Sequence, residues 1–180
     1  NNPLEIIKIW QGGMAFHGGL LGVTLAMILF ARRHAIPVLK VSDRVAMVLP
    51  IGLFLGRLSN FINGELIGRV SKMPWAMVFP NSDGLPRHPS QLYEAGVEGL
   101  CLGLAMLIAA KRGWLGAPGR ITGLMLAGYG AARYLVEFVR EPDTHLGFLF
   151  GGLTMGQLLC LPMIASGLYL LRHGRNQPRV

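Results

Sequence analysis

The sequence predicts an all-α integral membrane protein, and three observations carry this prediction. Of the 180 residues, 52% are hydrophobic and only 14% are charged, whereas about a quarter of the residues in a soluble domain are charged. No charged side chain occurs between Leu146 and Leu171, and His17 is the only ionisable group between Ile9 and Ala31. Because a spanning helix needs about 20 mainly apolar residues, both runs are long enough to cross a bilayer.

The apolar runs divide the chain into about five transmembrane helices within a single domain, residues 1–180. The expected spans are residues 14–31, 45–62, 91–110, 120–139 and 150–171. The 25 glycines suit close helix contacts in lipid, and they also suit re-entrant or broken helix segments that line a cavity. The chain starts at "NNPLEIIKIW", without an initiator methionine, so we expect that an N-terminal part is missing.

Three basic segments indicate how the chain is oriented in the membrane. They read "ARRHAIPVLK", "KRGWLGAPGR" and "RHGRNQPR", and alternation of the spans places all three on one side. The positive-inside rule makes that side cytoplasmic, together with the C-terminus, and it leaves the loop 63–90 on the opposite face. The net charge of +8 therefore reflects topology and anionic lipid. No aromatic-basic RNA motif is present, so no nucleic-acid partner is expected.

An unusual concentration of polar residues follows the apolar run "VAMVLPIGLFL" in the segment "GRLSNFINGELIG". Arg57 and Asn60 are spaced to share one face of a helix. They suit an anion site, in which a guanidinium supplies charge and amides supply orientation. The alternative is an arginine that snorkels at a helix end before an ordinary turn at "NG". The second asparagine and Glu65 favour the anion site.

A second polar group lies in "YGAARYLVEFVREPD", where Tyr129, Arg133 and Glu137 are spaced four residues apart and Arg140 follows. A charge inside a membrane helix is costly, so it normally faces the protein interior and has a partner. The Arg133–Glu137 pair either serves helix packing alone or takes part in a site. Arg133 is the stronger functional candidate, because a second arginine beside Arg57 would suit phosphate.

The segment "HPSQLYEAGVEG" places Gln91, Glu94 and Glu98 along one stripe of a helix that Ser90 is expected to cap. Two carboxylates four residues apart suit acid–base chemistry or a metal. The alternative is that they neutralise arginines on neighbouring helices, and we favour this interpretation. The lone His88 before Pro89 is expected to be structural.

His17 lies between two glycine pairs in "QGGMAFHGGLLG". It suits a general base near neutral pH or a hydrogen bond to a neighbouring helix, and the residues alone slightly favour the latter. Cys101 and Cys160 lack CxxC spacing and are expected to be packing residues. There is no H-E-x-x-H, DxxD, P-loop or GxSxG motif, so neither a metal nor a cofactor is expected. The remaining polar groups suit chemistry at a lipid phosphate, where positioned cations stabilise developing charge.

Four blocks in this order resemble the bacterial prolipoprotein diacylglyceryl transferases: "GGMAFHGGLLG", "GRLSNFINGELIG", "RHPSQLYE" and "YGAARYLVEFVREPD". The terminal "MGQLLCLPMI" is also similar to the last span of that family, so the resemblance extends from about Trp10 to Leu171. It implies a multi-pass transferase of the bacterial inner membrane. Such enzymes move the diacylglyceryl group of phosphatidylglycerol to the lipobox cysteine of a prelipoprotein, form a thioether and release glycerol phosphate, the first step of lipoprotein maturation.

The resemblance also implies roles for individual residues. Catalytic roles fall on His17, Arg57 and Arg133. Phosphatidylglycerol binding falls on Arg57, Asn60, Gly68, Tyr129, Arg133 and Arg140. Glu65 and Glu137 match the family as charge partners, a role that the residues themselves suggest for Glu94 and Glu98. Members normally carry further N-terminal membrane helices, which this chain lacks. The base that forms the thiolate is either His17 or the arginine field itself. The main alternative function is a non-catalytic phospholipid-binding or transport protein, and a metal-dependent head-group transferase is a second one.

Overall fold

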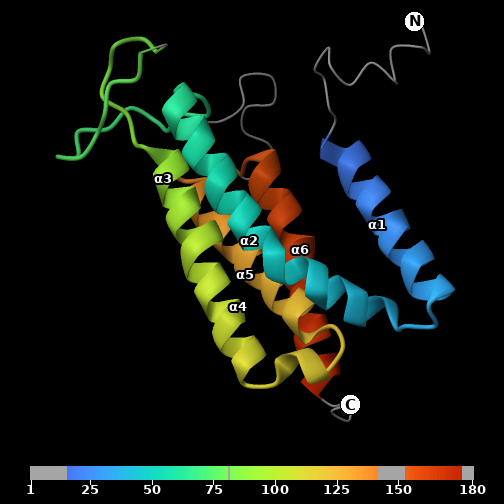
Figure 1. The fold of residues 1–180 in the computed structure, drawn as a ribbon. Helices are drawn as coiled ribbons and strands as arrows, with labels where there is room; N and C mark the ends of the chain where they lie inside the picture. Colours follow the sequence, from blue (N-terminus) through green and yellow to red (C-terminus); the bar gives the residue numbers. More distant parts are fainter. Residues whose placement is uncertain (1–15, 81, 142–152, 176–180) are drawn as a thin grey trace, which may run out of the picture.

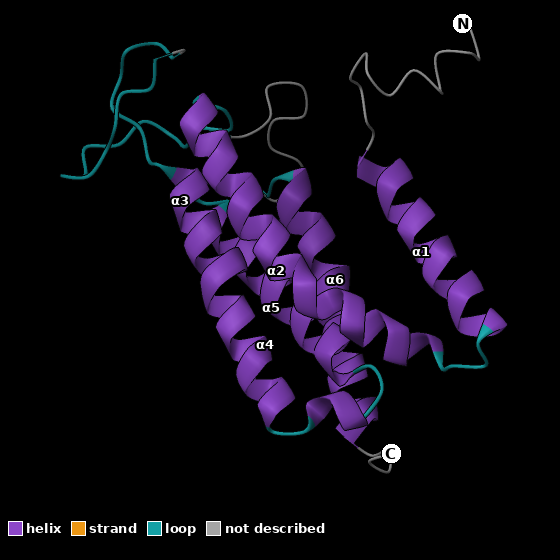
Figure 2. Cartoon of the chain, viewed as in Figure 1, coloured by secondary structure: helices purple, strands orange, loops and turns teal. Residues whose placement is uncertain are grey.

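The computed structural model describes residues 16–80, 82–141 and 153–175, and these residues form helices and loops without a strand (Figures 1 and 2). The helices are α1 (Phe16–Arg33), α2 (Val38–Asn63), α3 (Ser90–Glu94), η3 (Ala95–Cys101), α4 (Leu102–Lys111), η4 (Trp114–Gly116), α5 (Arg120–Val136) and α6 (Met155–Arg175). α3, the π-helical η3 and α4 follow one another without a break. The prediction of an all-α protein is therefore confirmed.

The helices α2 to α6 form one bundle, and α1 lies beside it and contacts α2 (Figure 1). The helices α5 and α6 pack most closely, because small residues let their backbones approach. A Cβ atom added to Gly123 would lie 2.8 Å from the carbonyl oxygen of Gly167. Such contacts between small residues hold helices together in lipid, where the hydrophobic effect between helices is absent.

Both ends of the bundle can be followed in Figure 1. α2 and α5 end, and α3 and α6 begin, at the end from which the long loop 64–89 leaves. The loops 34–37 and 112–119 lie at the other end. Residues from all four helices therefore meet at the end that carries the long loop.

Three of the described helices are long and apolar enough to cross a membrane, which supports a multi-pass membrane protein. They are Val38–Asn63, Ser90–Lys111 and Met155–Gly174. Large apolar side chains are exposed along their outer faces, among them Val48, Leu104 and Leu159. Helix α5 has 17 residues and α1 has 18, and neither is among the three helices that meet the criteria. Membrane crossing by α1 and α5 therefore stays a prediction.

The second helix begins at Val38, seven residues before the expected start at residue 45. The sequence hides this start because Lys40, Asp43 and Arg44 interrupt the apolar run. The structure explains the buried acid. Both carboxylate oxygens of Asp43 accept backbone N–H groups at the start of α5, from Gly119 at 2.8 Å and from Thr122 at 2.7 Å. Asp43 thereby caps a neighbouring helix rather than its own.

Candidate active site

Three arginines from two separate parts of the sequence converge on one carboxylate, that of Glu94. Arg57 on α2 approaches it through Nε at 2.6 Å, and Arg133 on α5 approaches it through Nη1 at 2.9 Å. Arg140, just after α5, lies at 3.5 Å. The Glu94 side chain is 1% exposed, and the three arginine side chains are 11–17% exposed. We call these four residues the arginine cluster.

Glu137 extends the arginine cluster toward α6. It pairs with Nη2 of Arg133 at 2.8 Å, while Nη1 of the same guanidinium reaches Glu94. The hydroxyl of Thr154 donates to Glu137 at 2.9 Å. The two Nη groups of Arg133 therefore bind two different carboxylates. Arginine allows this bridging geometry, and the single ammonium group of lysine does not.

Glu98 lies one helical turn after Glu94 and has a different environment. It is completely buried, and neither carboxylate oxygen has a hydrogen-bond partner among the described residues. It lies within electrostatic range of Glu94, Arg57 and Arg133, and of Tyr129 on α5. Glu98 belongs to the π-helical η3, a distortion often found at functional sites.

The segment Asn60–Leu66 closes one side of the site through a tight turn. Gly64 ends α2 with φ of +68°, a conformation that glycine adopts without strain. The Asn60 amide donates to the Glu65 carboxylate at 3.2 Å, so in the described part of the chain Glu65 meets Asn60 and not an arginine. The amide of Gln91 donates to the backbone oxygen of Glu65.

The expectation that Ser90 caps its own helix is wrong. Pro89 occupies the N-cap position of α3 without a side-chain cap bond. The Ser90 hydroxyl instead donates to the backbone oxygen of Leu66 at 3.0 Å. Ser90 therefore ties the start of α3 to the turn that follows α2. The reason is that α3 begins one residue earlier than expected, so Ser90 is its first helical residue and Pro89 takes the N-cap position.

Gly68 is the point at which the long loop passes between two other backbone segments. Its N–H donates to the carbonyl oxygen of His88 at 3.0 Å, and the N–H of Arg69 donates to that of Val139 at 2.9 Å. An added Cβ atom at residue 68 would lie 2.6 Å and 2.7 Å from these two oxygens. A side chain has no room there, so the structure accounts for glycine by packing.

The long loop is anchored by Arg87, which donates to Asp83 at 2.8 Å, to Glu141 at 2.8 Å and to the carbonyl oxygen of Gly68 at 3.0 Å. The hydrogen bonds from Arg87 hold the pKa of the Asp83 carboxyl below its usual value of 3.8. The same carboxylates raise the pKa of Arg87. In the loop His88 contacts the hydroxyl of Tyr93, at 3.2 Å.

Other candidates lie outside this cluster. The side chain of His17 falls outside the described residues, although its backbone lies in the first turn of α1. Cys101 is exposed and Cys160 is buried, and both are free thiols. No group of three metal-ligating side chains occurs among the described residues.

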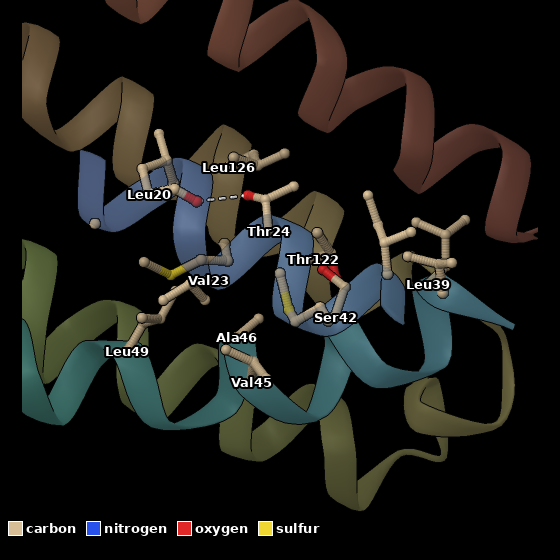
Figure 3. A pocket seen from close by; sticks show the side chains of 15 residues that line it. Leu20, Val23, Thr24, Leu39, Ser42, Val45, Ala46, Leu49, Thr122 and Leu126 are labelled. Carbon is tan, nitrogen blue, oxygen red and sulfur yellow. Dashed lines mark hydrogen bonds between the residues drawn. The ribbon is translucent and has the colours of Figure 1, made fainter. Parts of the chain in front are cut away.

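A cavity of about 850 Å³ opens between α1, α2 and α5 (Figure 3). Its lining is mostly aliphatic, and its polar groups already have partners. Thr24 donates to the carbonyl oxygen of Leu20, and the Thr122 hydroxyl donates to Asp43 at 2.7 Å and lies 3.0 Å from the Ser42 hydroxyl. None of the cluster residues lines it. The cavity is therefore separate from the arginine cluster.

Sequence inspection missed Thr154, which joins α6 to Glu137. Its signal was present as the spacing T-x-x-Q in "TMGQ", which is typical of a helix start. This signal is weak because it lies within a long uncharged run, which predicts a continuous membrane helix. The structure begins that helix at Met155, five residues later than expected.

Comparison with known proteins gives a consistent result. The family described as prolipoprotein diacylglyceryl transferase matches residues 1–173. A protein of Methylocella silvestris named phosphatidylglycerol–prolipoprotein diacylglyceryl transferase is 57% identical over 95% of this chain and 63% of its own length. Proteins of the same name are 55% identical in Sinorhizobium medicae, over 98% of this chain and 64% of the relative, and in Nitratidesulfovibrio vulgaris, over 98% and 67%.

The chain thus spans just under two thirds of the length of the first two relatives, 63% of the Methylocella silvestris protein and 64% of the Sinorhizobium medicae protein. The match nevertheless includes every segment that contributes to the arginine cluster. The chain belongs to the prolipoprotein diacylglyceryl transferase family.

Proposed function

We propose that the protein containing this chain transfers the diacylglyceryl group of phosphatidylglycerol to the lipobox cysteine of a prelipoprotein. One observation carries the proposal. Three guanidiniums gather around Glu94 at the end of a bundle of membrane helices. At this depth in a bilayer, the phosphate of a lipid head group is the nearest anion. The names of the relatives support the choice of lipid and acceptor.

The arginine cluster has donors to spare for a phosphate. Arg57 meets Glu94 through Nε, and no hydrogen bond of its two Nη groups occurs among the described residues. An arginine offers five N–H donors in a planar fork that matches phosphate oxygens. We place the lipid phosphate against Arg57 and Arg133, with Asn60 at the edge and Arg140 behind. Tyr129 lies one turn before Arg133 on the same face of α5.

The reaction breaks a carbon–oxygen bond. The thiolate sulfur of the prelipoprotein attacks the diacylglyceryl carbon that bears the phosphate ester, and a carbon–sulfur bond forms. The electron pair of the broken bond goes to the phosphate oxygen, and glycerol phosphate leaves with the additional charge. Fixed cations accelerate this step to the extent that they bind the leaving phosphate more strongly in the transition state than in the bound lipid.

The thiol must lose its proton before attack, because the thiolate is the nucleophile and a free cysteine has a pKa of ~8.5. Two groups can promote this loss. His17 is the candidate base, and the positive field of Arg57 and Arg133 is the alternative. His17→Gln keeps a hydrogen-bonding side chain without the basic nitrogen. Loss of turnover that higher pH restores would support His17, and full activity would assign the task to the arginines.

We further propose that the protein resides in the bacterial inner membrane as one transmembrane domain with a cytoplasmic C-terminus. The loops 34–37 and 112–119 lie at one end of the bundle, and the loop 64–89 lies at the other (Figure 1). Basic side chains lie in and beside the first two loops, among them Arg32, Arg33, Lys40, Lys111 and Arg112. The positive-inside rule makes the first end cytoplasmic. The arginine cluster then faces the outer leaflet, on the side where exported prelipoproteins emerge.

The decisive experiment uses the protein as its gene encodes it in full, reconstituted with phosphatidylglycerol that is labelled in the diacylglyceryl group. We expect the label on the cysteine of a lipobox peptide and an equal amount of released glycerol phosphate, with no loss in EDTA. A phospholipid transporter would return the lipid unchanged. A metal-dependent head-group transferase would lose activity in EDTA.

A further inference from the structure

Thr154 connects the last helix to the arginine cluster. It lies just before α6, is 4% exposed, and donates its hydroxyl to Oε1 of Glu137 at 2.9 Å. The other oxygen of Glu137 pairs with Arg133 at 2.8 Å. A single hydroxyl at the start of α6 is therefore connected, through Glu137, to the guanidinium that is proposed to hold the lipid phosphate.

Local structure fixes the direction in which this hydroxyl donates. The N–H of Gln157 donates to Oγ1 of Thr154 at 3.2 Å, and the N–H of Thr154 donates to Oε1 of Gln157 at 3.1 Å. This reciprocal pair is a capping box. Because the Thr154 oxygen already accepts the helix N–H, its one proton is directed to Glu137.

Gly156 shows that the carboxylate of Glu137 is pressed against the first turn of α6. An added Cβ atom at residue 156 would lie 3.0 Å from Oε1 and 3.1 Å from Cδ of Glu137. The N-terminus of α6 also carries partial positive charge, which favours a carboxylate at this place. Three features of the α6 start therefore fix the position of the Glu137 carboxylate: the hydroxyl of Thr154, the absence of a Cβ atom at Gly156 and the partial charge of the helix end.

We propose that Thr154 is a positioning residue that fixes the guanidinium of Arg133 through Glu137. The proposal rests on the proposed function, in which Arg133 binds the lipid phosphate. Without the hydroxyl, the Glu137 carboxylate is free to rotate away from the α6 start. Arg133 then loses the fixed partner of Nη2 and keeps only the contact of Nη1 with Glu94.

The test compares Thr154→Val with Thr154→Ser in the full protein, and Thr24→Val is the matched control. Thr24 donates only to Leu20 within α1. A hydrogen bond to a charged group is worth enough that we expect a fall of roughly 10- to 100-fold in kcat/KM for phosphatidylglycerol in Thr154→Val. The KM for the lipobox peptide should not change, and Thr154→Ser should recover most of the activity. Equal values for the valine and serine variants would overturn the proposal.

A second readout does not depend on turnover. Phenylglyoxal modifies accessible arginines, and mass spectrometry measures the rate of its reaction with Arg133. We expect this rate to rise several-fold in Thr154→Val and not in Thr154→Ser or Thr24→Val. An unchanged rate would contradict the positioning role. A changed rate in a protein whose wild type transfers no lipid would leave that role standing and reject the proposed function instead.

A double-variant cycle identifies the route. If Thr154 acts through Glu137, adding Thr154→Val to Glu137→Gln should change kcat/KM by less than twofold. A full additional loss in the double variant would show that the hydroxyl acts by another path and would overturn the proposal.

Discussion

Arg57 and Arg133 hold the two oxygens of one carboxylate, Oε2 and Oε1 of Glu94, at 2.6 and 2.9 Å. The two arginines are 76 residues apart in the sequence and come from α2 and α5. Glu94 therefore sets the distance between the two cations before any anion arrives. A site arranged in this way needs little reorganisation when charge develops on a leaving phosphate, which is the condition for effective electrostatic stabilisation.

The bridging geometry of Arg133 predicts that lysine cannot replace it. A lysine keeps the charge but has a single ammonium group, which cannot reach Glu94 and Glu137 in the way the two Nη groups do. We expect Arg133→Lys to lower kcat by roughly 100-fold or more, the scale of losing one oxyanion donor. Arg44→Lys, an exposed position near the other end of α2, should leave turnover unchanged. Near-normal turnover of Arg133→Lys would reject the bridging role of Arg133.

Glu94 and Glu98 predict opposite effects of the same substitution. Glu94→Gln removes the shared counter-charge of three guanidiniums, and breaking a buried ion pair costs about 3–5 kcal/mol. Glu98→Gln breaks no ion pair found in the described residues and removes a buried carboxylate without hydrogen-bond partners, whose burial is costly when it is charged. We expect a lower melting temperature for the first variant and an equal or higher one for the second. Equal losses would contradict this assignment.

The packing at Gly68 predicts a strong effect of one methyl group. In Gly68→Ala the new Cβ atom would lie within 2.7 Å of two carbonyl oxygens, so the loop must move, at a cost of about 1–3 kcal/mol. Limited proteolysis should cut the loop 64–89 faster in this variant. Gly56→Ala, whose Cβ would meet no atom within 4 Å, should behave as the wild type. Equal cleavage rates for the two variants would reject the packing account of Gly68.

The fold class and many residues of the site were predictable from the sequence, because both depend on where charges interrupt apolar runs. Arg57, Arg133 and Glu137 are conspicuous as charges within the membrane spans that the sequence predicts, where each needs a partner. The partner itself was not predictable. Glu94 and Glu98 occupy equivalent places on one stripe of the helix. The packing of α2 and α5 against α3 decides that the arginines pair with Glu94.

The start of each helix was harder to predict for a related reason. Asp43 interrupts an apolar run and therefore suggests a loop, although it lies within α2 and caps α5 from the side. Thr154 lies in an uncharged run that suggests continuous helix, although α6 begins just after it. In both cases a contact between helices distant in the sequence decides the local structure, and hydropathy contains no information on such contacts.

The Asp83–Arg87 pair predicts a pH dependence of the long loop. The folded-state pKa of Asp83 is lowered chiefly by the hydrogen bonds from Arg87, so the stabilisation is fully present above the usual pKa of 3.8. It is lost as the pH falls from 3.8 through the folded-state pKa. Amide exchange in the loop should be slower in the wild type than in Asp83→Asn at pH 6. This difference should vanish well below pH 3.8, and a difference that persists there would contradict the pairing.

The hydrogen bonds of Asp43 predict that its removal lowers the free energy of unfolding without lowering catalytic turnover. Asp43→Ala leaves the N–H groups of Gly119 and Thr122 without their acceptor in a fully buried place, and each unsatisfied group costs about 1–3 kcal/mol. Thr122→Val removes only the hydroxyl that donates to Asp43 and contacts the Ser42 hydroxyl, so its cost should be smaller. Thermal unfolding in detergent measures both variants.

The activity of the same Asp43 variants separates helix capping from a role in the site. Asp43 caps the start of α5, and Glu94 lies at the opposite end of the bundle, where α5 ends and α3 begins (Figure 1). Turnover per folded molecule, measured below the melting temperature of Asp43→Ala, should therefore match that of the wild type within about twofold, because distant and unconnected sites act independently. A larger fall in the folded protein would show that the position of α5 relative to α2 is transmitted along the helix to Arg133.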